Sequence, residues 1–328
     1  MHYTQLGRTG LTVSVASLGC GGNSRLGLGR GKSEADAIAL VRAARDEGVT
    51  FFDTAEAYGT EEVLGRAFSP SERAGLVIST KSRILKGSQR MTAAEVVANL
   101  EASLKRLRTD RVEVFLLHGV APQHYDYVRG ELAPVLLAEK AKGKLGHLGL
   151  SETGPNDPEH IMLLRAVADP VWEVMMLAFH MMNQNARRAL FPRAQAGGVG
   201  TLLMFVVRNI FSRPGLLAET VRTLAAEGKV SAELAARDNP LDFLIHPGGA
   251  TSLIDAAYRF ARREPGADVV LFGTSDIGHM RTNVASILAP PLPAADVSRL
   301  YELFGHLVGV GLDLPDNVKP EAKTGSGS

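Results

Sequence analysis

The sequence has little of what secreted, membrane-bound or nucleic-acid-binding proteins depend on. Its 328 residues include one cysteine, Cys20, which excludes an internal disulfide framework. With 36 basic and 35 acidic side chains the net charge is +1, so no strong field favours nucleic acid or an anionic membrane. No run reaches the roughly 18 apolar residues of a membrane span. The N-terminal MHYTQLGRTG lacks a signal peptide's apolar core, and we expect a cytoplasmic protein whose partner is a small molecule.

What the sequence does contain is a regular alternation of short apolar runs with longer amphipathic stretches, typical of repeated β-α units. The stretch after Lys32 predicts a helix that Ser33 caps and Gly48 ends, and Thr92 caps another. Eight apolar runs predict strands: VASLG (15–19), VTFFD (49–53), LVIST (76–80), VEVFLLH (112–118), LGHLGL (145–150), VWEVMML (171–177), GTLLMF (200–205) and VVLFG (269–273).

Eight such units favour an α/β fold of the closed (β/α)₈ TIM barrel type, because closure removes the unpaired edges of the sheet. An open doubly wound sheet is the alternative. The first residues, TQLGRTGLTVS, predict a β-hairpin before the barrel, and residues 209–267 form an extended segment between strands seven and eight that we expect to cover the site. We assign residues 1–318 to one domain and 319–328 to a disordered tail.

Four titratable residues stand at or just beyond the ends of consecutive predicted strands: Asp53, Tyr58, Lys81 and His118. In a barrel, the C-terminal ends of the strands meet at one mouth. Each residue also has an ordinary structural interpretation: a helix cap, half-buried packing, a lysine reaching solvent, or a hydrogen-bonded core histidine. Four unrelated structural roles at successive strand ends would be a coincidence, so we prefer the hypothesis that the four residues form one functional site.

The chemistry of this set fits carbonyl reduction. A phenol with an ordinary pKa near 10 is a poor acid, and a neighbouring ammonium such as that of Lys81 would lower the pKa of Tyr58. Asp53 would keep the buried ammonium charged. His118 would donate to the carbonyl oxygen that becomes an alkoxide as hydride arrives.

The motif FFDTAEAYGTEEVLGRAF, followed by STK and LLH at the next strand ends, resembles the aldo-keto reductase superfamily. The resemblance runs over roughly residues 4–290. It implies a barrel that binds NADPH, with NADH possible, and that reduces an aldehyde or ketone to an alcohol, reversibly, with Tyr58 as general acid.

The resemblance also implies cofactor contacts at the later strand ends. Ser151 stands where the family has a serine on the nicotinamide carboxamide, but Glu152 replaces the usual asparagine and Met176 the usual glutamine. An aromatic residue commonly stacks on nicotinamide near Met204 and Phe205. The loop GTSDIGHMRTN leads into a helix N-terminus, an arrangement that favours phosphate. Its candidate cofactor residues are Gly273, Thr274, Ser275, His279, Arg281 and Asn283.

Other functions remain open. A Schiff-base barrel lyase would use Lys81 as nucleophile. A reductase-like nucleotide-binding regulatory module is compatible with the altered nicotinamide contacts. The glycines of GLGRGK imitate a dinucleotide fingerprint, but Lys32 occupies its third glycine position. No HExxH or cysteine cluster predicts a metal. His180 and Arg208, just past strands six and seven, are expected to be solvated loop residues, with a place in the lining of the substrate pocket as the alternative.

Overall fold

The structure is a computed structural model that describes residues 1–313, so residues 314–318 of the predicted domain and the predicted tail 319–328 lie outside the described residues. Eight parallel strands close into a barrel in the order β10-β11-β12-β3-β4-β5-β8-β9. The predicted (β/α)₈ barrel is therefore confirmed. Its strands are β3 Ala16–Gly19, β4 Phe51–Asp53, β5 Val77–Arg83, β8 Val112–Val120, β9 Leu145–Glu152, β10 Val174–Ala178, β11 Gly200–Met204 and β12 Val269–Phe272.

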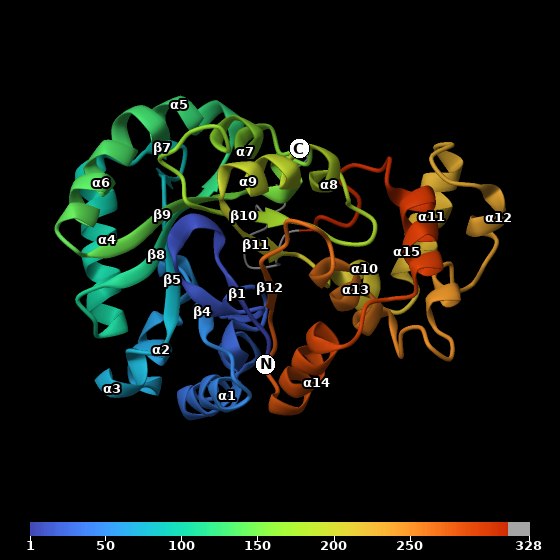
Figure 1. Ribbon diagram of the computed structural model, residues 1–328, viewed down its shortest axis with the longest axis horizontal. Helices are drawn as coiled ribbons and strands as arrows, with labels where there is room; N and C mark the ends of the chain where they lie inside the picture. Colours follow the sequence, from blue (N-terminus) through green and yellow to red (C-terminus); the bar gives the residue numbers. More distant parts are fainter. Residues whose placement is uncertain (314–328) are drawn as a thin grey trace, which may run out of the picture.

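Helices surround the barrel (Figure 1). Ser33 and Thr92 cap their helices as predicted, and each forms a capping box: its hydroxyl accepts from the third helical N–H, and that residue's carboxylate accepts from the N–H of the capping residue. The helices are α1 Glu34–Asp46, α2 Glu61–Ala67, α3 Pro70–Arg73, α4 Ala93–Leu107, α5 Tyr125–Tyr127, α6 Ala133–Ala141, α7 Ile161–Ala166, α8 Ala186–Ala189, α9 Phe191–Gly197, α10 Asn209–Ser212, α11 Leu216–Ala226, α12 Ala232–Ala235, α13 Leu253–Arg262, α14 Ile277–Leu288 and α15 Ala294–Phe304.

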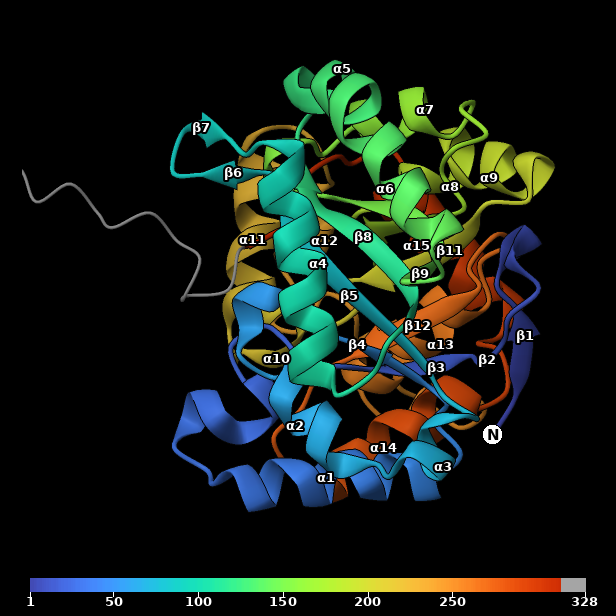
Figure 2. The same cartoon turned by 90° about the vertical axis from the view of Figure 1, so that its left-hand side faces the viewer.

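The predicted N-terminal hairpin consists of β1 Tyr3–Gln5 and β2 Thr12–Ser14. Leu6 and Val13 are fully buried and belong to the apolar cluster inside the barrel. Figure 2 shows β1 and β2 at one end of the barrel, and the small hairpin of β6 Leu85–Lys86 and β7 Gln89–Arg90 toward the other. The first hairpin therefore closes the end opposite the strand C-termini and leaves the mouth free.

The extended segment between β11 and β12 carries α10 to α13. In Figure 1, α11 and α12 lie to the side of the barrel strands. The helix α10 follows β11 directly, at the C-terminal end of that strand. That the segment covers the site stays a prediction. Among residues 1–313, no helix is long and apolar enough to cross a membrane.

Candidate active site

Asp53 and Lys81 form a buried ion pair at the ends of neighbouring strands. Lys81 Nζ lies 2.7 Å from each carboxylate oxygen of Asp53 and 2.8 Å from the carbonyl oxygen of Thr54. The hydroxyl of Ser79 also donates to the Asp53 carboxylate. Ser79 and Lys81 are two positions apart in β5, so their side chains point to the same side of the strand. The register of the barrel thus delivers both donors to one carboxylate.

Tyr58 ends the 3₁₀ turn Glu56–Tyr58, which follows β4. Its hydroxyl lies 3.3 Å from His118 Nε2, and the two rings meet edge to face with centroids 5.6 Å apart. The ammonium of Lys81 lies 5.1 Å from the centroid of the Tyr58 ring. Gly21 lines the other side of this ring, where an added Cβ would stand 2.5 Å from a ring carbon. The structure therefore brings the four predicted side chains together.

Two strands extend farther than the sequence indicated. Lys81 and His118 were placed at or just beyond strand ends, but β5 continues to Arg83 and β8 to Val120, with Arg83 opposite His118 in the register. Lys81 pairs with Leu116 of β8, and His118 pairs with Arg83 of β5 next to a register shift between β8 and β9, so both backbones belong to strands and not to loops.

Burial dominates the acidity of the site. Desolvation raises the pKa of Tyr58, and the opposing effect of Lys81 does not overcome it because Asp53 acts in the other direction. Lys81 acts on the pKa of Tyr58 in the expected direction, but burial outweighs it, so the pKa lies above its ordinary value. Burial works against the charged form of Lys81, yet the Asp53 carboxylate keeps its pKa above the ordinary value. Burial, then the charges of Lys81 and Arg83, lower the pKa of His118 to about 3, so its imidazole is neutral.

Ser151 and Glu152 end strand β9 beside this group. The hydroxyl oxygen of Ser151 accepts a hydrogen bond from Gly119 N–H at 2.8 Å, next to His118, and its own proton remains available to a ligand. The carboxylate of Glu152 is buried and accepts from Ala178 N–H at 2.8 Å and from His160 Nδ1 at 2.7 Å. Glu152, which was expected to contact the cofactor, is thus already hydrogen-bonded within the protein.

His160, which the sequence did not single out, completes a buried network. Its Nε2 lies 3.1 Å from Asn185 Oδ1, and the Asn185 amide is oriented because its nitrogen donates at 2.5 Å to the carbonyl of Pro158. Both ring nitrogens of His160 therefore face acceptors, a carboxylate and an amide oxygen, which requires the doubly protonated imidazolium. Its partners lie 8 and 25 residues away in the sequence, so no local pattern could have revealed the network.

The remaining nicotinamide candidates lie on β10 and β11. Met176 is buried in the barrel interior and offers no amide. Met204 ends β11, and Phe205 follows with a left-handed φ of 65°, a strained conformation for a bulky residue. The guanidinium carbon of Arg208 lies 4.4 Å from the centroid of the Phe205 ring. Phe205 thus presents an aromatic ring at the end of β11, and the guanidinium of Arg208 lies over one face of that ring.

The loop after β12 is largely engaged with its own helix. Asp276 caps α14 by accepting from His279 N–H at 2.9 Å, and the hydroxyl of Thr274 accepts from Asp276 N–H at 3.1 Å. Arg281 is exposed and pairs with Glu47 at 2.8 Å. Lys32 also contacts this loop, which the sequence did not predict: its Nζ donates to the carbonyl of Ser275 at 2.5 Å. Gly273 is exposed beside this loop, and Asn283 is half-buried on α14.

His180 and Arg208 differ from the sequence prediction. His180 is fully buried with its ring 5.3 Å from that of Phe211, and the side chain of Arg208 is only 14% exposed. Both follow barrel strands and face α10 and the last described residues, so they are held by packing and are not solvated.

Comparison with known proteins places this geometry in context. A model of the aldo/keto reductase family matches residues 17–304. The aldo-keto reductase YhdN of Bacillus subtilis is 28% identical over 302 residues, which are 85% of this chain and 87% of that protein. The L-galactose dehydrogenase of Arabidopsis thaliana is 30% identical over 203 residues, 60% of this chain and 62% of that enzyme. The holo form of aldo-keto reductase AKR11C1 from Bacillus halodurans matches with a TM-score of 0.69 at 20% identity, over 93% of this chain and 96% of that one, which shows a shared fold.

Proposed function

The chain belongs to the aldo/keto reductase family, and from this premise we propose that it is an NADPH-dependent reductase of aldehydes or ketones, reversible on the corresponding alcohols, with Tyr58 as general acid. Membership of the family makes it an oxidoreductase that acts on a small molecule. The observation that carries the finer proposal is the contact of Tyr58 with His118 at 3.3 Å beside the buried Lys81–Asp53 pair.

The site has one proton to give and a means to stabilise the charge left behind. At neutral pH the raised pKa of Tyr58 keeps it a phenol. A carbonyl oxygen between the Tyr58 hydroxyl and the neutral ring of His118 would meet two groups able to hydrogen-bond. When Tyr58 protonates the alkoxide, the ammonium of Lys81 stabilises the resulting phenolate, and Asp53 keeps that ammonium in place.

The cofactor would supply the hydride, and Ser151, Phe205 and the loop after β12 would hold it. Ser151 retains a hydroxyl proton for a carboxamide oxygen, and Phe205 presents an aromatic ring at the same end of the barrel. The cations of Lys32 and Arg281 near this loop support a 2′-phosphate and hence NADPH, although Arg281 must first leave Glu47. The Glu152 carboxylate accepts a hydrogen bond from His160, so it would not contact the cofactor.

The Schiff-base lyase is disfavoured by the geometry of Lys81. Its ammonium donates to Asp53 and to the Thr54 carbonyl, and its pKa is raised by Asp53 despite burial, so no free amine is available for attack. The regulatory module keeps one supporting observation, the absence of an amide at Glu152 and Met176. It predicts nucleotide binding without turnover.

One experiment separates these functions. NADPH and NADH are titrated by fluorescence, and a panel of aldehydes and ketones is then followed at the nicotinamide absorbance. We expect tighter binding of NADPH and its carbonyl-dependent oxidation. Binding without turnover on any panel member would favour the module, and an adduct on Lys81 trapped by borohydride would favour the lyase.

A further inference from the structure

The last described residues are tied to the end of β11 by one carboxylate. Arg208 Nη2 donates to Asp313 Oδ2 at 2.7 Å and also to the Asp313 carbonyl. The amide nitrogen of Asn209 donates to the same Oδ2 at 2.6 Å. Two donor side chains that follow a barrel strand thus converge on a single acidic residue, at the end of the barrel where Tyr58 and His118 lie.

Arg208 has more donor capacity than Asp313 uses. Its Nε is buried and has no hydrogen-bond partner among residues 1–313. Leaving a buried guanidinium N–H unsatisfied is costly, and a two-oxygen or three-oxygen anion matches the guanidinium fork better than one carboxylate oxygen does. The neighbouring Phe205, held at positive φ with its ring against the guanidinium, fixes where the fork lies.

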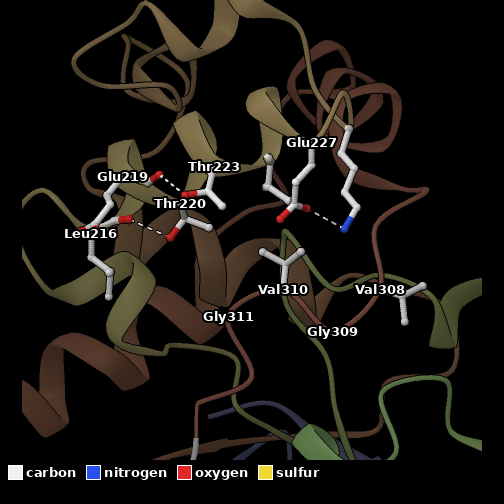
Figure 3. A pocket seen from close by; sticks show the side chains of 11 residues that line it. Leu216, Glu219, Thr220, Thr223, Glu227, Val308, Gly309, Val310 and Gly311 are labelled. Carbon is white, nitrogen blue, oxygen red and sulfur yellow. Dashed lines mark hydrogen bonds and ion pairs between the residues drawn. The ribbon is translucent and has the colours of Figure 1, made fainter.

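The segment that carries Asp313 contains two glycines and runs past an open hollow. Gly309 and Gly311 both have positive φ, and Gly311 packs against Ile210 and His180 on one side. On the other side, between residues 308–311 and α11, lies a hollow of about 340 Å³ (Figure 3). Gly309 N–H donates to Asn183 Oδ1 at 2.8 Å, which holds the start of this segment, so a ligand would need to displace only Asp313 at its end.

We propose that Arg208 and Asn209 form an oxyanion site at the barrel mouth, for a carboxylate or phosphate group, and that Asp313 is an internal carboxylate that occupies it until a ligand displaces it. The site goes beyond carbonyl reduction itself, and its connection to turnover rests on the proposed function. The oxyanion could belong to the substrate, as a carboxylate, or to the cofactor, as a phosphate.

If Asp313 competes with a bound oxyanion, neutralising Asp313 and neutralising Arg208 should change the affinity for oxyanions in opposite directions. Asp313→Asn removes the internal competitor and should tighten oxyanion binding about tenfold. Arg208→Gln removes the charged donor and should weaken it about tenfold or more. The matched controls are Asp242→Asn and Arg237→Gln, which neutralise an exposed ion pair of the extended segment and should leave every affinity unchanged.

The affinities are measured by calorimetry with three probes: benzoate, inorganic phosphate and NADPH. If the two variants shift benzoate alone, the oxyanion belongs to the substrate; if they shift phosphate and NADPH, it belongs to the cofactor. Wild-type affinity of Asp313→Asn for all three probes would overturn the site and identify the Arg208–Asp313 pair as purely structural. A wild type that binds benzoate or phosphate, with these shifts, but not NADPH would contradict the proposed function and still support the site.

Discussion

Tyr58 lies beside two charges of opposite sign, which act on its pKa in opposite directions. Lys81 favours its phenolate and Asp53 disfavours it, so burial decides the sign of the pKa shift. Asp53 thus has a second effect besides keeping Lys81 charged. Together with burial, it also raises the pKa of Tyr58 and so favours the protonated phenol, which a proton donor requires.

Replacing Tyr58 with Phe removes the proton and retains the ring. We expect kcat for carbonyl reduction to fall by about 10² to 10⁴, the usual contribution of a positioned general acid, with the Kd for NADPH nearly unchanged. Steady-state kinetics and a fluorescence titration measure the two quantities. Tyr3→Phe, at an exposed tyrosine of β1, is the control. Full turnover by Tyr58→Phe would show that another group donates the proton.

Gly21 gives a second test of the same side chain. An alanine there would place its Cβ 2.5 Å from a ring carbon of Tyr58, so the ring must shift and lose its alignment with His118. We expect Gly21→Ala to lower kcat at least about tenfold, since small misplacements of catalytic groups are costly. Gly75→Ala, where an added Cβ meets nothing within 4 Å, is the matched control. Unchanged kcat in Gly21→Ala would mean that the position of Tyr58 is not critical.

At the scale of elements, a buried charge pair connects the ends of β9 and β10. Glu152 accepts from the backbone of β10 and from His160, while Asn185, the residue before α8, binds the other side of the imidazolium. Four segments therefore depend on one protonated histidine. The Glu152 carboxylate and the nearby Asp157 face it and raise its pKa against the effect of burial.

Because the pKa of His160 is raised in the fold, its contribution to stability depends on pH. A histidine whose pKa is raised on folding stabilises the fold fully below its unfolded pKa of about 6.5 and loses that contribution as pH rises through the folded pKa. His160→Gln keeps one hydrogen bond but not the charge. Because a charge-assisted hydrogen bond is lost, we expect it to lower the free energy of unfolding by about 2 kcal/mol at pH 6, and by less at pH 9.

Urea denaturation of the wild type and of His160→Gln at both pH values measures this difference. His246→Gln is the control, because His246 also pairs with a carboxylate but is exposed. A destabilisation by His160→Gln that is the same at pH 6 and pH 9 would show that His160 is not an imidazolium in the fold.

At the scale of the molecule, the two ends of the barrel have separate tasks. The N-terminal hairpin inserts Leu6 beneath the strands, and Arg8 N–H bonds the carbonyl of Gly198 at 2.6 Å. The opposite end holds the four predicted catalytic side chains. Because the buried Leu6 and the catalytic side chains lie at opposite ends of the barrel, we expect stability and activity to vary independently.

Leu6→Ala tests this separation. Removing a fully buried leucine should cost about 2 to 5 kcal/mol of unfolding free energy, measured in urea, while kcat stays near the wild-type value because the mouth is untouched. Leu137→Ala, at a leucine that is 37% exposed, should cost far less. A large fall in kcat for folded Leu6→Ala would show that the two ends are coupled.

The sequence by itself determined the barrel and the presence of its four titratable residues. Apolar runs separated by capped amphipathic helices admit few other folds, since parallel strands buried on both faces need continuous apolar runs. Parallel strands also carry their C-terminal residues to one end, so Asp53, Lys81 and His118 could be grouped from strand order alone.

Only the tertiary structure decided the electrostatics around them. The pKa of Tyr58 depends on burial and on two opposing charges, which are properties of distances and not of residue types. The Glu152–His160–Asn185 network and the Arg208–Asp313 contact join residues from 8 to 105 positions apart. Such contacts leave no periodic trace in a single sequence, because the fold and not the local chain brings their members together.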